Sequence, residues 1–131
     1  DLLNKQHLIG KVIFTGKQKN VREFLDISEI YVQPTIGQGE GAPIAVLEAM
    51  VNGKNIIASD VSGIRDQLSD FPKHLFKPGS VSDLTKKLTI LMDMSEDENK
   101  QIGELFNRYV KKNYSLKNEV ILVQRLYNQI I

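Results

Sequence analysis

The sequence predicts an α/β protein, in which a Rossmann-like parallel sheet with flanking helices is followed by a wholly helical C-terminal third. Two observations carry this prediction. Short runs rich in β-branched residues alternate with helical patterns up to Pro78 and Gly79, which is typical of βα units and a parallel sheet. After Gly79 only helical patterns remain.

Composition places the chain among ordinary globular proteins. Its 131 residues suit one domain with one hydrophobic core. The 17 basic and 16 acidic residues give a net charge of +1, without the basic excess expected of a nucleic-acid-binding protein. Cysteine is absent, which excludes disulfides and thiol chemistry. No run approaches the roughly 18 apolar residues that a bilayer-spanning helix needs.

Four strands and one short helix are expected in the α/β part. Gly16 closes the first strand, Pro34 ends the second, and the last is a short edge strand. The predicted strands are Val12–Thr15, Glu29–Gln33, Asn55–Ser59 and His74–Lys77. A helix over Val21–Ile27 separates the first two strands, with Asn20 as its N-cap.

The longer helices show clear termination signals. Between the second and third strands, Pro43 suits the first helical position and Gly53 the C-terminal cap. Ser82 is expected to cap a helix that reaches about Asp93, and Ser95 with Glu98 has the spacing of a capping box. The capping-box helix reaches about Lys112. The last helix carries one apolar stripe, made of Leu116, Val120, Val123, Tyr127 and Ile130.

Two glutamates frame the start of the helix after Pro43. On a helical wheel, one broad apolar face contains Ile44, Val46, Leu47, Met50 and Val51, with Ala45 and Ala49 opposite. Glu48 falls at the border of these faces. If its carboxylate is largely buried it needs a partner, and no basic residue lies within helical reach. The partner is then a residue distant in sequence or a ligand.

The start of this helix resembles a phosphate site. Gly39 and Gly41 let the backbone approach a bound group, and a helix N-terminus offers free N–H donors and partial positive charge. It also follows the carboxyl end of a strand, where parallel α/β sheets bind ligands. A phosphate flanked by carboxylates that accept hydrogen bonds from hydroxyls suggests a nucleotide sugar. The simpler alternative is a common glycine-rich turn, with Glu48 partly exposed or in a structural ion pair.

Other features favour structural roles. A glycosidase pair needs no anion-binding helix start between its carboxylates, and the sequence has no Asp-x-Asp motif for a metal-dependent transferase. His7 and His74 are isolated. Ser62 and Gly63 form a turn that could also reach a phosphate. Arg65 suits a surface ion pair, with contact to a phosphate as the alternative. The pairs Lys86–Lys87 and Lys111–Lys112 suit solvated faces, with weak attraction to an anionic membrane left open.

Several segments together resemble the C-terminal domain of family-4 retaining glycosyltransferases, which have the two-domain GT-B architecture. They are "FTG" (14–16), "IYVQPT" (30–35), "GEGAPIAVLEAMVNGKNIIASD" (39–60), "SGIRD" (62–66), "LFKPGSVSDL" (75–84) and "NYSLKNEVILVQRLY" (113–127). The E-x7-E element is met by Glu40 and Glu48. Alone this spacing is weak, but between a strand ending in Pro-Thr and a helix followed by "IIASD" it is specific. Pro43 departs from the family, which often has glycine there.

The resemblance implies a role for each matching residue. Glu40 is the catalytic residue, lying by the donor sugar and stabilising positive charge at the anomeric carbon. Glu48 accepts hydrogen bonds from the ribose of the nucleotide. The diphosphate is held by the backbone of Gly41, Ala42, Pro43 and Ile44, and the nucleobase meets the loop that contains Gly16, Gln18 and Asn20.

The resemblance also implies what surrounds this chain. Residues 1–131 are expected to be a single donor-binding domain, truncated at its N-terminus and lacking the N-terminal acceptor domain and the Arg/Lys pair of the first strand–helix unit. By family analogy the terminal helix crosses back onto that missing domain. The intact enzyme would transfer sugar from a UDP- or GDP-linked donor without metal or other cofactor, in cell-envelope or capsular polysaccharide biosynthesis. It would be cytoplasmic, with peripheral association at the inner face of the membrane left open, and this fragment alone would be inactive. The alternative is a non-catalytic nucleotide-sugar-binding or interaction module of the same fold.

Overall fold

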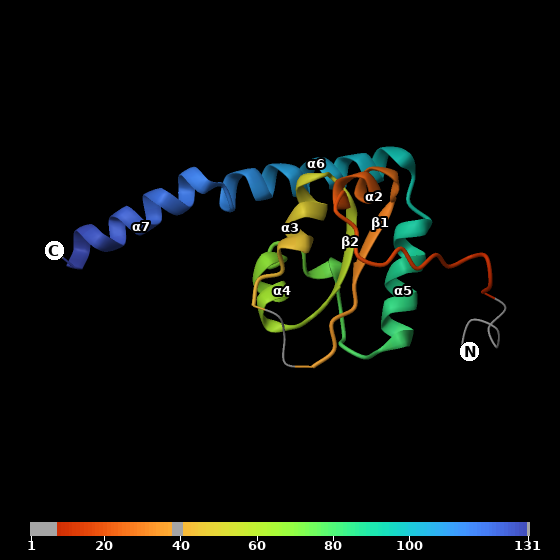
Figure 1. Ribbon diagram of the computed structural model, residues 1–131. Coiled ribbons are helices and arrows are strands. Elements are labelled where there is room, and N and C mark those ends of the chain that lie inside the picture. The colour runs from red at the N-terminus through yellow and green to blue at the C-terminus, as the bar shows by residue number, and fades with distance from the viewer. Residues whose placement is uncertain (1–7, 38–40, 131) are drawn as a thin grey trace.

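The computed structural model describes residues 8–37 and 41–130. Three parallel strands form one sheet in the order β1-β2-β3, and helices lie around it (Figure 1). The predicted α/β class is confirmed. The elements are α2 Val21–Ile27, β1 Ile30–Gln33, α3 Ile44–Val51, β2 Asn55–Ser59, α4 Ser62–Gln67, the 3-10 turn η1 Pro72–His74, β3 Leu75–Phe76, α5 Val81–Met92, α6 Glu96–Asn113 and α7 Leu116–Ile130.

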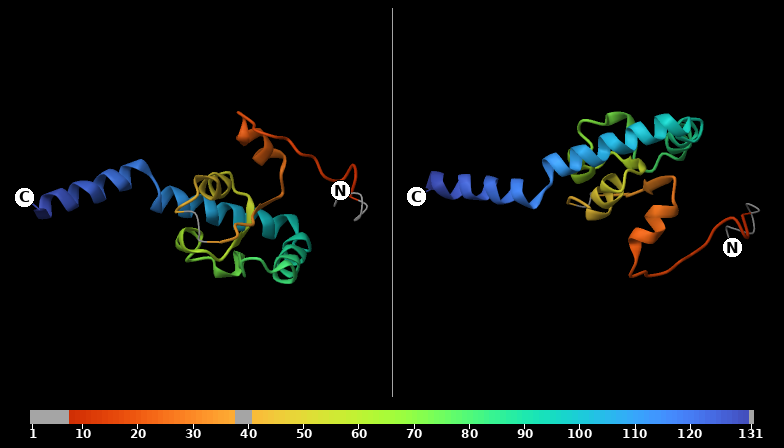
Figure 2. Two further views of the ribbon diagram at one scale, coloured as in Figure 1. Left: turned by 60° about the horizontal axis from the view of Figure 1, so that its bottom comes forward. Right: turned by 90° about the horizontal axis from the view of Figure 1, so that it is seen from above.

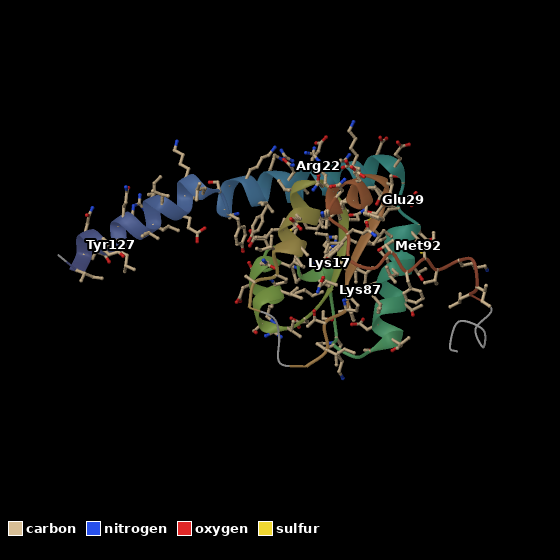
Figure 3. All side chains as sticks on the ribbon, viewed as in Figure 1. Lys17, Arg22, Glu29, Lys87, Met92 and Tyr127 are labelled. Carbon is tan, nitrogen blue, oxygen red and sulfur yellow. The ribbon has the colours of Figure 1, made fainter. Side chains whose placement is uncertain are left out.

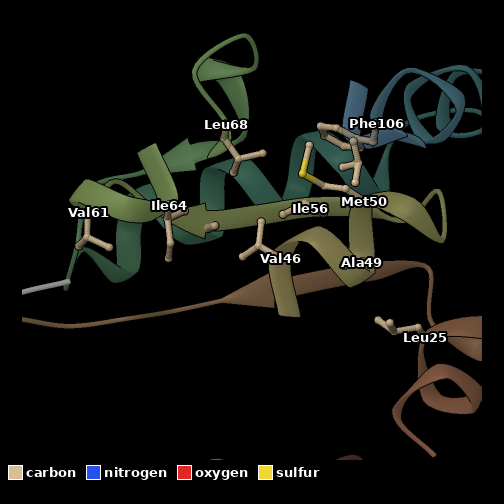
Figure 4. Packing of buried hydrophobic residues seen from close by; sticks show 11 residues of the cluster. Leu25, Val46, Ala49, Met50, Ile56, Val61, Ile64, Leu68 and Phe106 are labelled. Carbon is tan, nitrogen blue, oxygen red and sulfur yellow. The ribbon is translucent and has the colours of Figure 1, made fainter. Parts of the chain in front are cut away.

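The central strand β2 is buried along its whole length, which fits its position between two parallel neighbours. Its side chains alternate between the two faces of the sheet. Ile56 and Ala58 join one core cluster with residues of α3, α4 and α6, as Figure 4 shows from close by. Ile57 joins a second cluster with Phe76 and Leu91 on the α5 side. Helices therefore cover both faces.

Two glycines bring α6 into backbone contact with the end of α3. Gly53 has a φ of 68°, a left-handed conformation that suits the residue after a helix C-cap. Gly103 lies in the middle of α6, and a β-carbon added there would meet the carbonyl oxygen of Gly53 at 2.1 Å. Beside this crossing Phe106 and Met50 are fully buried, and the Asn107 side chain donates to the Val51 carbonyl.

His74 belongs to an aromatic cluster under α6. Its Nδ1 lies 2.8 Å from the carbonyl oxygen of Ile56; because that oxygen only accepts, Nδ1 carries the proton. The imidazole makes an edge contact with Phe106, with ring centroids 4.9 Å apart. Burial lowers the pKa of His74, and the nearby Lys87 and Lys73 add to this, against the opposing effect of the Ile56 hydrogen bond. The structural role expected for His74 is thus the one observed.

The predicted strand over Val12–Thr15 is wrong. This segment is not paired, and Ile13 and Phe14 are 83% and 81% exposed. A strand requires a neighbour for its backbone groups, and within residues 8–37 and 41–130 no strand pairs with this one. Figure 2 shows the segment leading away from the body of the molecule.

The other element boundaries need three smaller corrections. The N-cap of α5 is Ser80, whose side chain accepts from the Asp83 amide at 3.3 Å, and not Ser82. Asn20 occupies the N-cap position of α2, but its side chain donates to Glu23 and caps no amide. Residues expected to form a turn at Ser62–Gly63 begin the helix α4. The capping box of Ser95 and Glu98 is confirmed.

The last helix, α7, extends away from the body (Figure 1). It contains no buried residue, and its side chains, Tyr127 among them, stand clear of the other elements in Figure 3. The predicted apolar stripe is present and exposed, from Leu116 to Ile130. None of the helices in the described part of the chain has the length and apolar character needed to cross a membrane.

Candidate functional site

The candidate site is the start of α3 at the carboxyl edge of the sheet. β1 and β2 are parallel, so Gln33 and Ser59 end at the same edge, and the chain enters α3 after the loop that follows β1. Pro43 is the N-cap, with no side chain capping the helix. The sequence predicted Pro43 at the first helical position, and the structure places it one residue earlier. The amides of Ile44 and Ala45 have no intrahelical acceptor, whereas the Val46 amide donates to the Pro43 carbonyl. The helix start carries the partial positive charge that favours anions.

The predicted diphosphate residues lie on an accessible surface. Gly41 and Ala42 are exposed, Pro43 is half-buried, and Ile44 is 71% exposed. Because Pro43 has no N–H, the donors offered here are the amides of its neighbours. Backbone N–H groups at an exposed helix start can approach a phosphate without displacing core residues.

The apolar faces of α3 differ from the helical-wheel prediction. Val46, Ala49 and Met50 are buried against the sheet and α6, whereas Ile44 is exposed. The reason is the close crossing at Gly53 and Gly103, which draws the alanine side of the helix toward α6. Ala49 therefore packs in the core, and the exposed side passes through Ile44.

Glu48 lies on this exposed side. It is one turn after Ile44, and its side chain is exposed to solvent. Within the described part of the chain, no hydrogen bond or ion pair engages its carboxylate. The premise that Glu48 is largely buried is therefore wrong, and its carboxylate is satisfied by solvent without a ligand. Glu40, the predicted catalytic residue, lies outside the described residues.

The predicted nucleobase residues lie on a separate exposed segment. Gly16, Gln18 and Asn20 precede α2 and are exposed. Among the described residues, their side-chain hydrogen bonds stay local, from Gln18 to the Thr15 carbonyl and from Asn20 to Glu23. Within residues 8–37 and 41–130, no hydrogen bond joins this segment to the start of α3.

The unpredicted helix α4 borders the site. Arg65 pairs with Asp60, with 2.5 Å between Nε and Oδ1, and this pairing raises the pKa of the guanidinium. The surface ion pair expected for Arg65 is thus observed. At the end of α4, Gln67 is 1% exposed and donates from Nε2 to the Pro43 carbonyl at 3.2 Å. Its signal in the sequence is an amide side chain on the same side of the helix as the apolar Ile64 and Leu68, visible only once α4 is recognised.

A cavity larger than any at the helix start lies elsewhere among the described residues. It measures about 580 Å³ and is lined at the amino ends of β1 and β2 by Ile30 and Asn55, together with the end of α5 and the start of α6. Since parallel α/β sheets bind ligands at the carboxyl edge, size alone does not make it the candidate site. A smaller apolar cleft of about 160 Å³ lies at the carboxyl edge, between Pro34, Phe76 and Val81.

Comparisons with known proteins agree with this geometry. Residues 1–107 match the family described as "Glycosyl transferases group 1". The chain is 31% identical over 126 residues to the N,N'-diacetylbacillosaminyl-diphospho-undecaprenol alpha-1,3-N-acetylgalactosaminyltransferase of Campylobacter jejuni, covering 93% of this chain and 32% of the relative. Among solved structures, a glycosyltransferase from Rickettsia africae superposes with a TM-score of 0.87, at 21% identity over 98% of this chain and 34% of that one. The sucrose-phosphate synthase from Thermosynechococcus elongatus gives 0.81, also at 21% identity, over 98% and 32%. The chain thus spans about a third of the length of these proteins, and the fold expected from the sequence is confirmed.

Proposed function

The chain belongs to the glycosyl transferases group 1 family, and on that basis we propose that it is the donor-binding part of a retaining glycosyltransferase. The donor is a nucleoside-diphosphate sugar carrying UDP or GDP. The observation that supports this most is the start of α3, where uncapped amides at the carboxyl edge of a parallel sheet stand one helical turn from an exposed carboxylate.

The spacing on α3 suits such a donor. Four residues along a helix rise about 6 Å and stay on one face, so Glu48 stands about 6 Å beyond the amides at Ile44. That is the order of separation between a diphosphate and the hydroxyls of the attached ribose. The diphosphate then occupies the helix start, held by the backbone of Gly41, Ala42 and Ile44, and Glu48 accepts hydrogen bonds from the ribose.

The chemistry proposed here is electrostatic. Glu40 holds the hydroxyls of the donor sugar and stabilises positive charge at the anomeric carbon as the diphosphate departs, while the partial positive charge of α3 stabilises the leaving group. We propose that no metal ion takes part. Gln18 and Asn20 meet the base only if their segment approaches α3 in the donor complex.

The acceptor is proposed to bind another part of the intact protein. The Campylobacter relative is named for transfer to an undecaprenol-linked acceptor. By analogy we propose a role in cell-envelope or capsular polysaccharide synthesis, in the cytoplasm or at the inner face of the membrane. This chain alone would bind the donor without transferring its sugar.

A titration with UDP and GDP tests the proposal. Wild type, Glu48→Ala and the matched control Glu104→Ala are compared by isothermal calorimetry; Glu104 is an exposed glutamate on α6. Loss of hydrogen bonds to a charged acceptor predicts affinity at least tenfold weaker for Glu48→Ala and unchanged for Glu104→Ala. Failure of both nucleotides to bind at millimolar concentration, in this chain and in the intact protein, would contradict the proposal.

One observation favours the alternative of a non-catalytic module. The exposure of Glu48 removes any need for a ligand to neutralise it. An intact protein that binds nucleotide but neither transfers nor hydrolyses the donor sugar would support that alternative. Transfer of radiolabelled sugar from the donor decides between the two.

A further inference from the structure

A side chain of α4 reaches the start of the candidate site. Gln67 ends α4, and its Nε2 donates to the carbonyl oxygen of Pro43 at 3.2 Å. The same carbonyl accepts the amide of Val46 at 3.2 Å, which is the first backbone bond of α3. Across residues 8–37 and 41–130, this contact of Gln67 is the one hydrogen bond that ties segment 41–44 to another element.

Most of this segment is exposed, so little packing against other described residues holds it in place. Gly41 and Ala42 are exposed on one side of Pro43 and Ile44 on the other. The buried contacts of α3 begin at Val46 and continue through Ala49 and Met50. They fix the helix against the sheet and α6 but do not reach its first residues. The direction in which the first amides point therefore depends on the carbonyl of Pro43 and on the group that holds it.

The fold itself gives no reason for a glutamine at this position. Gln67 is 1% exposed, and its neighbours Ile64 and Leu68 are fully buried. Its Oε1 is buried without a hydrogen-bond partner among the described residues, which destabilises the folded state. An apolar side chain of the same length would fill the space without an unsatisfied acceptor, and Pro43 would keep its bond from Val46.

We infer that Gln67 is a positioning residue, which holds the Pro43 carbonyl so that the first amides of α3 face the diphosphate of the donor. This inference rests on the proposed function for the identity of the ligand. Gln67 touches no ligand itself in this arrangement. It acts through Pro43, from a different α/β unit of the chain.

The test separates stability from binding. Gln67→Met keeps the length of the side chain and removes both polar atoms, and Gln67→Leu provides a second apolar variant. Ser59→Ala is the matched control, because Ser59 is also fully buried at the carboxyl edge with an unpartnered Oγ among the described residues, but donates no hydrogen bond to Pro43. Melting temperature, hydrogen exchange of the Val46 amide and affinity for UDP and GDP are measured for each.

In the Gln67 variants, and not in Ser59→Ala, the melting temperature should be retained while amide exchange and nucleotide affinity change. We expect a melting temperature equal to or above that of the wild type, exchange of the Val46 amide about three- to tenfold faster, and nucleotide affinity about three- to tenfold weaker, the range set by the loss of one hydrogen bond. Ser59→Ala should match the wild type in exchange and affinity.

Each contrary result has a distinct meaning. Unchanged exchange at Val46 or wild-type affinity in both Gln67 variants would overturn the positioning role. A large fall in melting temperature in both would show that Gln67 is a structural residue, which also overturns it. If the wild type binds neither nucleotide, the proposed function fails, and the exchange rate of Val46 still decides whether Gln67 holds the start of α3.

Discussion

The crossing of α3 and α6 makes Gly103→Ala the most informative substitution for the fold. The added β-carbon would stand 2.1 Å from the Gly53 carbonyl oxygen and 2.9 Å from its carbonyl carbon. An ordinary C···O contact is about 3.3 Å, so the two backbones must separate by roughly 1 Å. The β-carbon is fixed by the α6 backbone and the Gly53 carbonyl is itself backbone, so neither can move aside by a change of rotamer.

The expected cost follows from two opposing effects. Overpacking of a tight contact costs about 1–3 kcal/mol. A gap of about 1 Å also forfeits up to half of the dispersion energy between facing atoms, here between Phe106 of α6 and Met50 of α3. Alanine offsets about 1 kcal/mol of this through its higher helix propensity. We expect a net loss of about 2 kcal/mol in the free energy of unfolding, or about 8 °C in melting temperature.

Urea denaturation followed by circular dichroism at 222 nm measures this loss. Gln101→Ala is the control, since Gln101 is exposed on the same helix and should change stability by less than about 0.5 kcal/mol. A Gly103→Ala variant as stable as the wild type, or more stable by the helix-propensity gain, would refute the close crossing and with it the explanation for the orientation of α3.

Two further predictions concern a titrating group and a helix cap. His74 is partly buried with its pKa lowered from the ordinary value of about 6.5, so the unfolded state binds the proton more tightly than the folded state. The free energy of unfolding should therefore fall as pH drops below about 6.5 toward the folded pKa. This dependence on pH should be weaker in His74→Gln; an unchanged dependence in that variant would assign it to other groups. Ser80→Ala should lower the free energy of unfolding by about 1 kcal/mol, because the Asp83 amide loses its acceptor. Ser82→Ala should lower it by less than half of that. Thermal melts in which Ser82→Ala is the less stable variant would identify Ser82 as the cap.

The elements predicted correctly are those specified by their own residues. Asn55–Ser59 contains the apolar run Ile56–Ala58 and forms a fully buried strand. Ser95 with Glu98 satisfies the start of α6 through local hydrogen bonds. The short helix α4 escaped prediction because its N-cap, Val61, has no capping side chain. The strand expected at Val12–Thr15 failed for the opposite reason: its pattern is suitable, but a strand also needs a neighbour that the pattern does not supply.

The same distinction, between features set by local residues and features set by tertiary packing, applies to the candidate site. The helix start after β1 could be predicted to within one residue, because Pro43, the glycines and the alternation of strands and helices are visible in the sequence. The exposure of Glu48 and Ile44 could not, because the side of α3 that is buried depends on Gly53 meeting Gly103, which are far apart in the chain. The contact from Gln67 to Pro43 likewise joins two units whose packing is tertiary.

The solvated position of α7 has a consequence for the energetics of the whole chain. An isolated helix of about 15 residues is marginal in water, and α7 has that length without a buried side chain to support it. Its opening is therefore a local event that does not require the sheet to unfold. In a native-state exchange experiment its amide protons should be replaced by deuterium long before those of β2, even when the domain as a whole remains intact.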